Sequence, residues 1–323
     1  MFQTFWKKFS RHAVLGAVFF LPYAQRRKIE RWMRGRVEVR KMEGADWVLV
    51  SWGKSGRTWL RVMLSRFYQL KFELPEGMLI GFDNMHRANP NAPKVFFTHG
   101  NYLKDYTGHD QDKRDFYGKK IVLLVRDPRD VAVSQFFQWK YRMRVRKKKL
   151  NDYPKHGSET SIYDFMMHPH QGMPRIIEYF NGWNVELDKI QNILVIRYED
   201  MRANPETVLK QVLEFTGTPG TDEQIAKAVE YARYENMKKL EEKSVFQLSG
   251  GRMQPGDRNN PDSYKVRRAK VGGYRDYYTD AQVAAIDAYM AEHLSPEFNY
   301  STEPLTIPKI DEVSSGGATQ ATA

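Results

Sequence analysis

The sequence contains no cysteine, which excludes disulfides, a thiolate nucleophile and cysteine-based metal sites. This absence suits a reducing compartment. The apolar run at residues 13–21 is too short to cross a bilayer as a helix, which takes about 20 residues. The chain instead carries an excess of positive charge, formally +12 at pH 7. Such a charge indicates anionic partners, among which nucleotide phosphates, acidic glycans, lipid headgroups and nucleic acid all qualify.

Length and composition divide the chain into three predicted parts. Residues 1–45 form a basic and apolar extension, and residues 46–305 form one globular domain. Residues 306–323 are rich in Ser, Gly, Ala and Thr, and we expect them to be disordered. With 323 residues, of which 41% are hydrophobic, the chain can bury a sizeable core.

The extension has three interpretations. Its apolar run has the length of a signal-peptide core, but Pro22-Tyr23-Ala24 is a poor cleavage site. Aromatic residues alternate with Lys and Arg over residues 2–11, as in a helix that lies on a membrane surface. The third interpretation is a helix that packs on the body of the protein. We therefore expect a cytoplasmic protein, with peripheral membrane contact through residues 1–30 as an open alternative.

A short strand, a glycine-bearing turn and an amphipathic helix follow one another at residues 47–67. The free N–H groups and the dipole of a first helical turn attract phosphate. Lys54, Ser55, Arg57 and Thr58 add cationic and hydroxyl donors at this turn. It is not a nucleotide-triphosphatase loop, because that motif needs a glycine where position 48 is Val.

Three further strands are predicted, and polar residues follow each of them. Val95–Phe97 precedes Thr98-His99, Ile121–Val125 precedes Arg126, and Ile193–Ile196 precedes Arg197-Tyr198. In open parallel sheets, ligands bind at the carboxyl ends of the strands. These side chains are therefore candidates for one site.

Each candidate also has a plainer interpretation. Arg126 could pair with Asp127 or Asp130, and Ser134 in the following helix could face solvent. Tyr198 could be a core aromatic residue with a wet hydroxyl. The basic stretch at residues 141–149 could be a solvated face, or a rim that attracts an acidic acceptor or a membrane.

The remaining signals concern helix ends and metals. Asn204-Pro205 predicts a helix start with Asn as the cap, and Gly217 predicts its end. Thr279-Asp280-Ala281-Gln282 predicts a capping box. His168-Pro169-His170 lacks a third plausible ligand, so we predict no metal site.

The order Lys54-Ser55-Gly56, with Thr58-Trp59 behind it, resembles the 5′-phosphosulfate loop of sulfotransferases that use 3′-phosphoadenosine-5′-phosphosulfate (PAPS). The family form is roughly Pro-Lys-Ser-Gly-Thr-Thr/Ser-Trp, so this chain has Gly53 for Pro and Arg57 for the first Thr. Thr98-His99, the Arg126–Ser134 pair, Tyr198-Glu199-Asp200-Met201 and residues 267–279 resemble further family motifs in the same order. Within the last segment, Ala269 replaces a glycine.

The resemblance covers about residues 46–294 and implies a P-loop-like, three-layer α/β fold, with a central parallel sheet and helices on both faces. It implies that PAPS is bound by Lys54, Ser55, Gly56, Arg57, Thr58, Trp59, Arg126, Ser134, Tyr198, Arg267 and Arg268. In this interpretation His99 is the general base, Lys54 stabilises the leaving phosphate, and no metal takes part. Sulfuryl transfer would then be in line, like phosphoryl transfer.

The acceptor and the assembly are less defined. A basic surface favours a glycolipid or polysaccharide hydroxyl, with a small alcohol, phenol or amine as the alternative. We expect no nucleic acid partner, and the oligomeric state is not encoded in any motif. Two functions of other classes remain as alternatives. One is an ATP-using kinase or hydrolase, and the other is a non-catalytic basic protein that binds membrane or nucleic acid.

Overall fold

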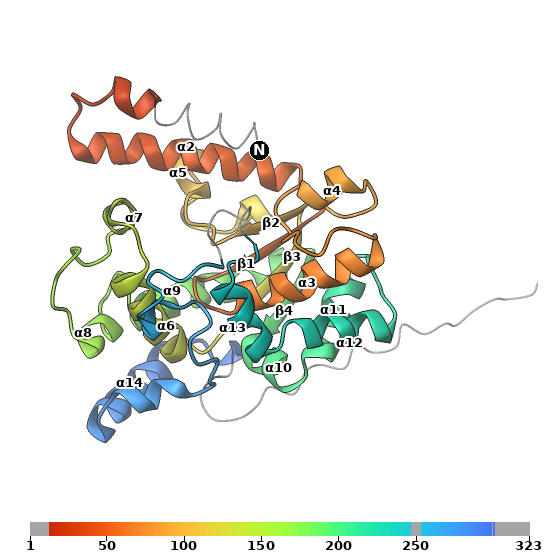
Figure 1. Ribbon diagram of the computed structural model, residues 1–323. Helices are drawn as coiled ribbons and strands as arrows, with labels where there is room; N and C mark the ends of the chain where they lie inside the picture. The colour runs from red at the N-terminus through yellow and green to blue at the C-terminus, as the bar shows by residue number, and fades with distance from the viewer. Residues whose placement is uncertain (1–12, 247–252, 299, 301–323) are drawn as a thin grey trace, which may run out of the picture.

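Figure 1 shows the computed structural model of the chain, which describes residues 13–246, 253–298 and 300. Its centre is a sheet of β1 (Trp47–Ser51), β2 (Val95–Thr98), β3 (Lys120–Val125) and β4 (Asn192–Arg197). All neighbouring strands are parallel, in the order β2-β1-β3-β4. The four predicted strands are confirmed. The predicted tail, residues 306–323, lies outside the described residues, as does part of the predicted extension, residues 1–12.

Helices cover both faces of the sheet, so β1, β2 and β3 are largely buried, while the edge strand β4 is partly exposed. Successive residues of β1 point to opposite sides, so Trp47 and Leu49 join one apolar cluster while Val48 and Val50 join the other. The first cluster includes α3 (Arg57–Lys71), α11 (Pro205–Phe215) and α12 (Asp222–Tyr231). The second includes α6 (Pro128–Tyr141), α9 (Met173–Asn184) and α14 (Asp280–His293). The predicted three-layer α/β fold with a central parallel sheet is confirmed.

Shorter elements connect and cover these layers (Figure 1). The α-helices are α4 (Asn84–Ala88), α5 (Leu103–Thr107), α7 (Val145–Leu150), α8 (Ile162–Met166), α10 (Tyr198–Ala203) and α13 (Tyr234–Glu242). The 3-10 turns are η1 (Arg114–Phe116), η2 (Leu187–Lys189), η4 (Pro261–Ser263), η5 (Gly273–Tyr277) and η6 (Pro296–Phe298).

The three predicted helix ends are confirmed in position, and one of them lacks the side-chain hydrogen bond of a cap. The Thr279 side chain and Gln282 form the expected capping box on α14. Gly217 has a left-handed φ of 78° just beyond α11, where Thr218 N donates to Leu213 O at 2.9 Å. Asn204 occupies the N-cap position of α11 and Pro205 is the first helical residue, as predicted, but the Asn204 side chain makes no capping hydrogen bond.

The long helix α2 (Tyr23–Glu43) packs on the body of the protein (Figure 1). Arg31 donates to both carboxylate oxygens of Asp105 at 2.8 and 2.9 Å, and Glu30 pairs with Arg146 at 2.8 Å. Gly35 lies so close to α5 that a Cβ there would be 2.2 Å from Tyr102 O. The packed-helix interpretation therefore holds for α2. Across the ranges that the structure covers, no helix is both long and apolar enough to cross a membrane.

Candidate active site

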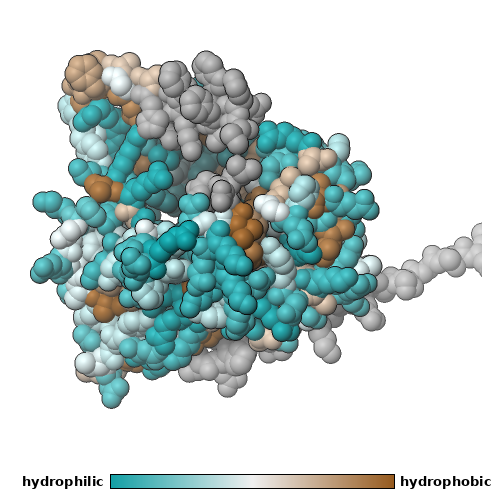
Figure 2. Space-filling view, viewed as in Figure 1, coloured by the Kyte–Doolittle hydropathy of each residue, from teal (hydrophilic) through white to brown (hydrophobic). Residues whose placement is uncertain are grey.

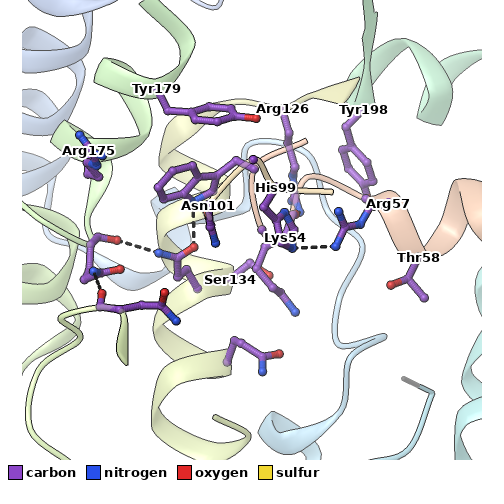
Figure 3. A pocket seen from close by; sticks show the side chains of 18 of the residues that line it. Lys54, Arg57, Thr58, His99, Asn101, Arg126, Ser134, Arg175, Tyr179 and Tyr198 are labelled. Atoms are coloured by element: carbon purple, nitrogen blue, oxygen red, sulfur yellow. Dashed lines mark hydrogen bonds between the residues drawn. The ribbon is translucent and has the colours of Figure 1, made fainter. Parts of the chain in front are cut away.

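The residues that follow the strands line one cleft of about 1200 Å³ (Figure 3). The loop between β1 and α3, the end of β2, the start of α6 and the start of α10 all reach it. Eleven of the twelve predicted site residues line the cleft: Lys54, Gly56, Arg57, Thr58, Trp59, His99, Arg126, Ser134, Tyr198, Arg267 and Arg268. Ser55 is the exception. Its side chain is fully buried, and Oγ has no hydrogen-bond partner among the described residues. Ser55 is not among the residues that line the cleft, and its predicted contact with PAPS stays a prediction.

The loop after β1 adopts two left-handed conformations. Lys54 has φ 74° and Gly56, which precedes the first residue of α3, has φ 95°. A Cβ at Gly56 would lie 2.5 Å from Cδ2 of Tyr198, so only glycine fits beneath that ring. Lys54 carries a side chain in a conformation that is unfavourable for it, and such strain is typical of ligand-binding loops. The loop after β1 and the ring of Tyr198 are thus in close steric contact at Gly56.

Arg126 connects the two halves of the predicted nucleotide site. Its Nη1 donates to the carbonyl of Lys54 at 3.2 Å, and its guanidinium lies 4.3 Å from the centre of the Tyr198 ring. Nη2 is 3.3 Å from Asp130 Oδ2, so the plainer interpretation, an ion pair with Asp130, is also present. Ser134 of α6 also lines the cleft. One guanidinium therefore touches the β1 loop, the ring of Tyr198 and α6.

The segment at residues 267–274 is fastened over this end of the cleft by Asp130. Gly272 N and Tyr274 N each donate to an oxygen of Asp130 at 3.0 Å, and Lys270 O accepts from Arg126 at 3.3 Å. Ala269 has φ 51°, a left-handed conformation that glycine adopts without strain. The alanine therefore keeps the backbone shape that a glycine would give.

Arg267 and Arg268 on this segment already have partners. Arg267 lies 3.8 Å from the centre of the Phe137 ring, and Arg268 pairs with Asp276. Both donate to the hydroxyl of Tyr277. They line the cleft, and their predicted contact with a phosphate stays a prediction.

Burial and, after it, the nearby guanidinium groups of Arg142 and Arg126 together lower the pKa of Lys54 to about 7. Burial also lowers the pKa of Lys265 well below its ordinary value, and Lys54 is the first of its charged neighbours to add to that effect. In an enclosed cleft where nearby cations disfavour the charge of both lysines, a bound anion stabilises their charged forms. This end of the cleft is therefore built for a negatively charged ligand.

His99 lies beside this anion site with both ring nitrogens engaged (Figure 3). Nδ1 donates to the carbonyl of Ser51 at 2.6 Å, and Nε2 lies 2.7 Å from Nη2 of Arg57. A guanidinium can only donate, so Nε2 is the acceptor and the proton sits on Nδ1. Burial lowers the pKa of His99 well below 6.5, and the charge of Arg57 lowers it further. The imidazole is therefore neutral at pH 7.

Comparison with known proteins assigns the chain to a family. A family model described as "Sulfotransferase domain" matches residues 117–296. The chain belongs to the sulfotransferase family. It is 26% identical over 300 residues to cytosolic sulfotransferase 17 of Arabidopsis thaliana, covering 84% of this chain and 82% of that protein. It is 24% identical over 258 residues to human sulfotransferase 6B1, covering 77% and 76%.

A solved structure is similar in fold. The crystal structure of retinol dehydratase in a complex with retinol and PAP superposes with a TM-score of 0.52 at 17% identity. The superposition covers 80% of this chain and 85% of that one. At this identity the similarity concerns the fold alone, and it agrees with the P-loop-like α/β arrangement described above.

The far side of the cleft in this sulfotransferase is formed by residues that the sequence did not single out. Trp52 Nε1 donates to Gln135 Oε1 at 2.9 Å, and Gln135 Nε2 donates to Gln171 O at 2.9 Å. In Figure 3, Asn101 and Tyr179 lie on the other side of His99 from Arg57. The hydroxyl of Tyr179 is buried without a hydrogen-bond partner among the described residues. A polar group thus lies in the part of the cleft beside His99.

A buried carboxylate that no motif pointed to holds the anion end together. Glu241 of α13 is fully buried, pairs with Arg142 at 3.1 Å and accepts from the N–H groups of Lys265 and Val266 at 2.8 and 2.9 Å. It thereby fixes the backbone that carries Lys265 beside Lys54. In the sequence, Glu241 stands out only as one Glu within a helix of mixed charge, and such a residue is too common to indicate a functional role.

Proposed function

We propose that this sulfotransferase transfers the sulfuryl group of PAPS to an acceptor hydroxyl, or to an amine, by in-line displacement. The observation that carries the proposal is the convergence of Lys54, Arg126 and His99 on one cleft. The two cations bracket a site for an anionic nucleotide, and the imidazole lies next to it. Retinol dehydratase, which shares the fold, was solved with PAP, and this supports a nucleotide donor of that kind.

In the proposed binding mode the 5′-phosphosulfate lies at the N-terminus of α3. The N–H groups of the first turn, Lys54 and Thr58 would hold its oxygens. Arg126, Ser134, Arg267 and Arg268 would hold the 3′-phosphate, which distinguishes this donor from ATP. Tyr198, whose ring already stacks on Arg126, would contact the adenine side.

The reaction needs charge stabilisation and one proton acceptor. Negative charge grows on the bridging oxygen and the leaving phosphate, where Lys54 and the loop N–H groups meet it. An alcohol is too weak an acid to attack unaided, so Nε2 of neutral His99 takes its proton. In the present arrangement Nδ1 is held by the carbonyl of Ser51, which keeps Nε2 as the basic nitrogen.

For the acceptor we favour the hydroxyl of a glycolipid or polysaccharide over a small alcohol, phenol or amine. The cleft is larger than the 300–1,000 Å³ typical of a small-ligand site. Beyond His99 its wall mixes the aromatic rings of Trp52 and Tyr179 with charged side chains of both signs, such as Arg175 and Asp105. A mixed wall of this kind suits a polar acceptor with many hydroxyl groups better than a uniformly apolar one.

We also propose that the outer end of the N-terminal segment contacts a membrane. Phe19 is 74% and Phe20 is 70% exposed, and Figure 2 shows hydrophobic residues gathered at this end. Along α2, an exposed stripe at four-residue spacing carries Lys28, Trp32, Arg36 and Arg40. Exposed aromatic and basic side chains together bind anionic lipid surfaces. Arg27 and Arg31 of the same helix line the cleft, so a lipid-borne acceptor would arrive close to His99.

The experiment that tests the function uses donor labelled in its sulfuryl sulfur. The protein and the labelled donor are incubated with an extract of the cells that make it, and the labelled product is identified. We expect label in a hydroxyl-bearing glycolipid or polysaccharide, and none with Lys54→Met. Labelled small alcohols or phenols would support the alternative acceptor, whereas no labelled product in any fraction would refute sulfuryl transfer.

A further inference from the structure

Arg57 occupies the only basic nitrogen of the proposed catalytic histidine. Its Nη2 lies 2.7 Å from Nε2 of His99, and its Nη1 donates to the carbonyl of Thr98 at 2.7 Å. Nδ1 of the same ring donates a hydrogen bond to the carbonyl oxygen of Ser51. A base cannot accept a proton at a lone pair that already accepts a hydrogen bond from a guanidinium. In the donor-free enzyme, His99 is therefore blocked.

The position of Arg57 in the chain shows what could release it. Arg57 is the first residue of α3, so its backbone sits at the helix terminus that faces the proposed phosphosulfate. Two of its present acceptors are a neutral imidazole nitrogen and a carbonyl oxygen. Hydrogen bonds from a guanidinium to a charged oxygen are roughly twice as strong as neutral ones. If an anionic sulfuryl group lies within reach, the guanidinium should therefore hydrogen-bond to its oxygens in preference to His99.

We propose that Arg57 is a donor-sensing latch on His99. Without donor it caps Nε2 and the base is idle. When PAPS binds, the guanidinium turns to the sulfuryl oxygens, which frees Nε2 for the acceptor hydroxyl and places a positive charge on the group in transfer. The bisphosphate product lacks the sulfuryl group, so after transfer the latch closes again. This inference rests on the proposed function, and it makes donor binding a precondition for an active base.

Several charged groups face His99 besides Arg57, and they set the background for its titration. Besides burial and Arg57, the cations Lys147 of α7 and Lys265 of the loop after α13 lower the pKa of His99. Burial raises the pKa of the Glu38 carboxyl on α2 to about 7, although the charges of Lys41 and Arg57 oppose that rise. Removing Arg57 takes away one positive neighbour and the hydrogen bond to the neutral ring, and both changes raise the pKa of His99.

The test compares the wild-type enzyme with Arg57→Met, which keeps the length of the side chain and removes its donors. Arg66→Met is the matched control, because Arg66 lies on the same helix but points to Glu76 and Tyr231. In protein labelled with ¹⁵N-histidine, the signal of His99 is assigned by its loss in His99→Gln. We expect Arg57→Met to raise the pKa of His99 by about one unit or more, and Arg66→Met to leave it unchanged.

A second experiment, in which nucleotides are added, distinguishes a contact between Arg57 and His99 that opens on donor binding from one that is permanent. PAPS added without acceptor should shift the Nε2 signal of wild-type His99 to that of an unbonded nitrogen, and 3′,5′-adenosine bisphosphate should not. Arg57→Met should show the unbonded signal before any ligand is added. Equal effects of the two nucleotides, or an Nε2 signal that is the same in wild type and Arg57→Met, would overturn the proposal. Because these readouts need no turnover, a failure of sulfuryl transfer would be recognised separately.

Discussion

The guanidinium of Arg126 donates a hydrogen bond to the carbonyl of Lys54 across 3.2 Å. Arg126 follows β3 and Lys54 follows β1, and these strands are direct neighbours in the sheet. Two cations that are 72 residues apart in the sequence therefore stand at the same edge, one at each proposed end of the nucleotide. This contact also supports the left-handed backbone of Lys54, because it fixes the carbonyl of that residue.

The proposed 3′-phosphate site predicts a selective loss of binding. Arg126→Ala and Ser134→Ala should each weaken 3′,5′-adenosine bisphosphate, by about tenfold or more for the arginine, because charge-assisted hydrogen bonds to a phosphate are lost. An analogue without the 3′-phosphate should bind both variants about as well as the wild type. Calorimetric titration of both nucleotides checks this. Equal losses for the two nucleotides would remove Arg126 and Ser134 from that role.

The general-base proposal predicts a separation of chemistry from binding. His99→Ala should abolish transfer but leave the affinity for 3′,5′-adenosine bisphosphate near normal, because the imidazole touches neither predicted phosphate site. Turnover with labelled donor and bisphosphate titration give the two readouts. Turnover retained by His99→Ala would exclude His99 as the base, and a large loss of nucleotide affinity would point to a binding role instead.

The low pKa of Lys54, about 7, predicts proton uptake when the donor binds. In the free enzyme Lys54 is partly neutral at pH 7 to 8, because burial and the neighbouring guanidinium groups disfavour its charge. An anionic donor favours the ammonium form and raises this pKa, so binding takes up a proton. Donor affinity should therefore fall as pH rises above about 7.

This prediction is checked by calorimetry at about pH 8, above the pKa of Lys54, in buffers of different ionisation enthalpy. The apparent enthalpy should depend on the buffer in the wild type and much less in Lys54→Met. Lys265 is a second lysine whose pKa is lowered, so Lys265→Met serves to divide the uptake between the two. No dependence on the buffer in the wild type would show that Lys54 keeps its charge in the free enzyme.

The strands and the ends of the main helices could be predicted because each rests on a local pattern. Ile121 to Val125 and Ile193 to Ile196 are continuous apolar runs that stand between polar or charged residues, and both lie in strands. The cleft was predictable to the extent that parallel strands bring residues such as Arg126 and His99 to one edge. What the local patterns could not show was the orientation of individual side chains.

Ser55 and Arg57 illustrate that limit. They are close neighbours in one loop, yet Ser55 is fully buried and does not line the cleft, while Arg57 reaches His99. The difference depends on the left-handed turns at Lys54 and Gly56, which only tertiary contacts with Arg126 and Tyr198 explain. Glu241 was missed for a similar reason. Its role depends on accepting hydrogen bonds from the backbone N–H groups of Lys265 and Val266, which are distant in the sequence and which no motif spacing indicates.

The exposed end of the N-terminal segment predicts binding to anionic vesicles. Phe19→Ser with Phe20→Ser should reduce sedimentation with vesicles that contain phosphatidylserine, because each exposed ring contributes apolar area to the interface. Val245→Ser is the control, since Val245 is 39% exposed and lies elsewhere. Lys28→Gln with Arg40→Gln should weaken the same binding and reduce its dependence on salt. Equal binding to neutral vesicles, or no effect of the phenylalanine changes, would contradict a membrane role for this segment.

The close fit between Gly56 and Tyr198 predicts a steric coupling that can be measured by a double-mutant cycle. Gly56→Ala should destabilise the fold by about 1–3 kcal/mol, because a Cβ would meet the Tyr198 ring at 2.5 Å and because φ 95° is strained for alanine. Tyr198→Ala removes the ring, so in that background the same change should cost only the backbone strain, roughly 1 kcal/mol. Denaturant unfolding of the wild type, the two single variants and the double variant gives the coupling energy. Additive effects would show that the ring does not restrict position 56, and the requirement for glycine would then come from the backbone alone.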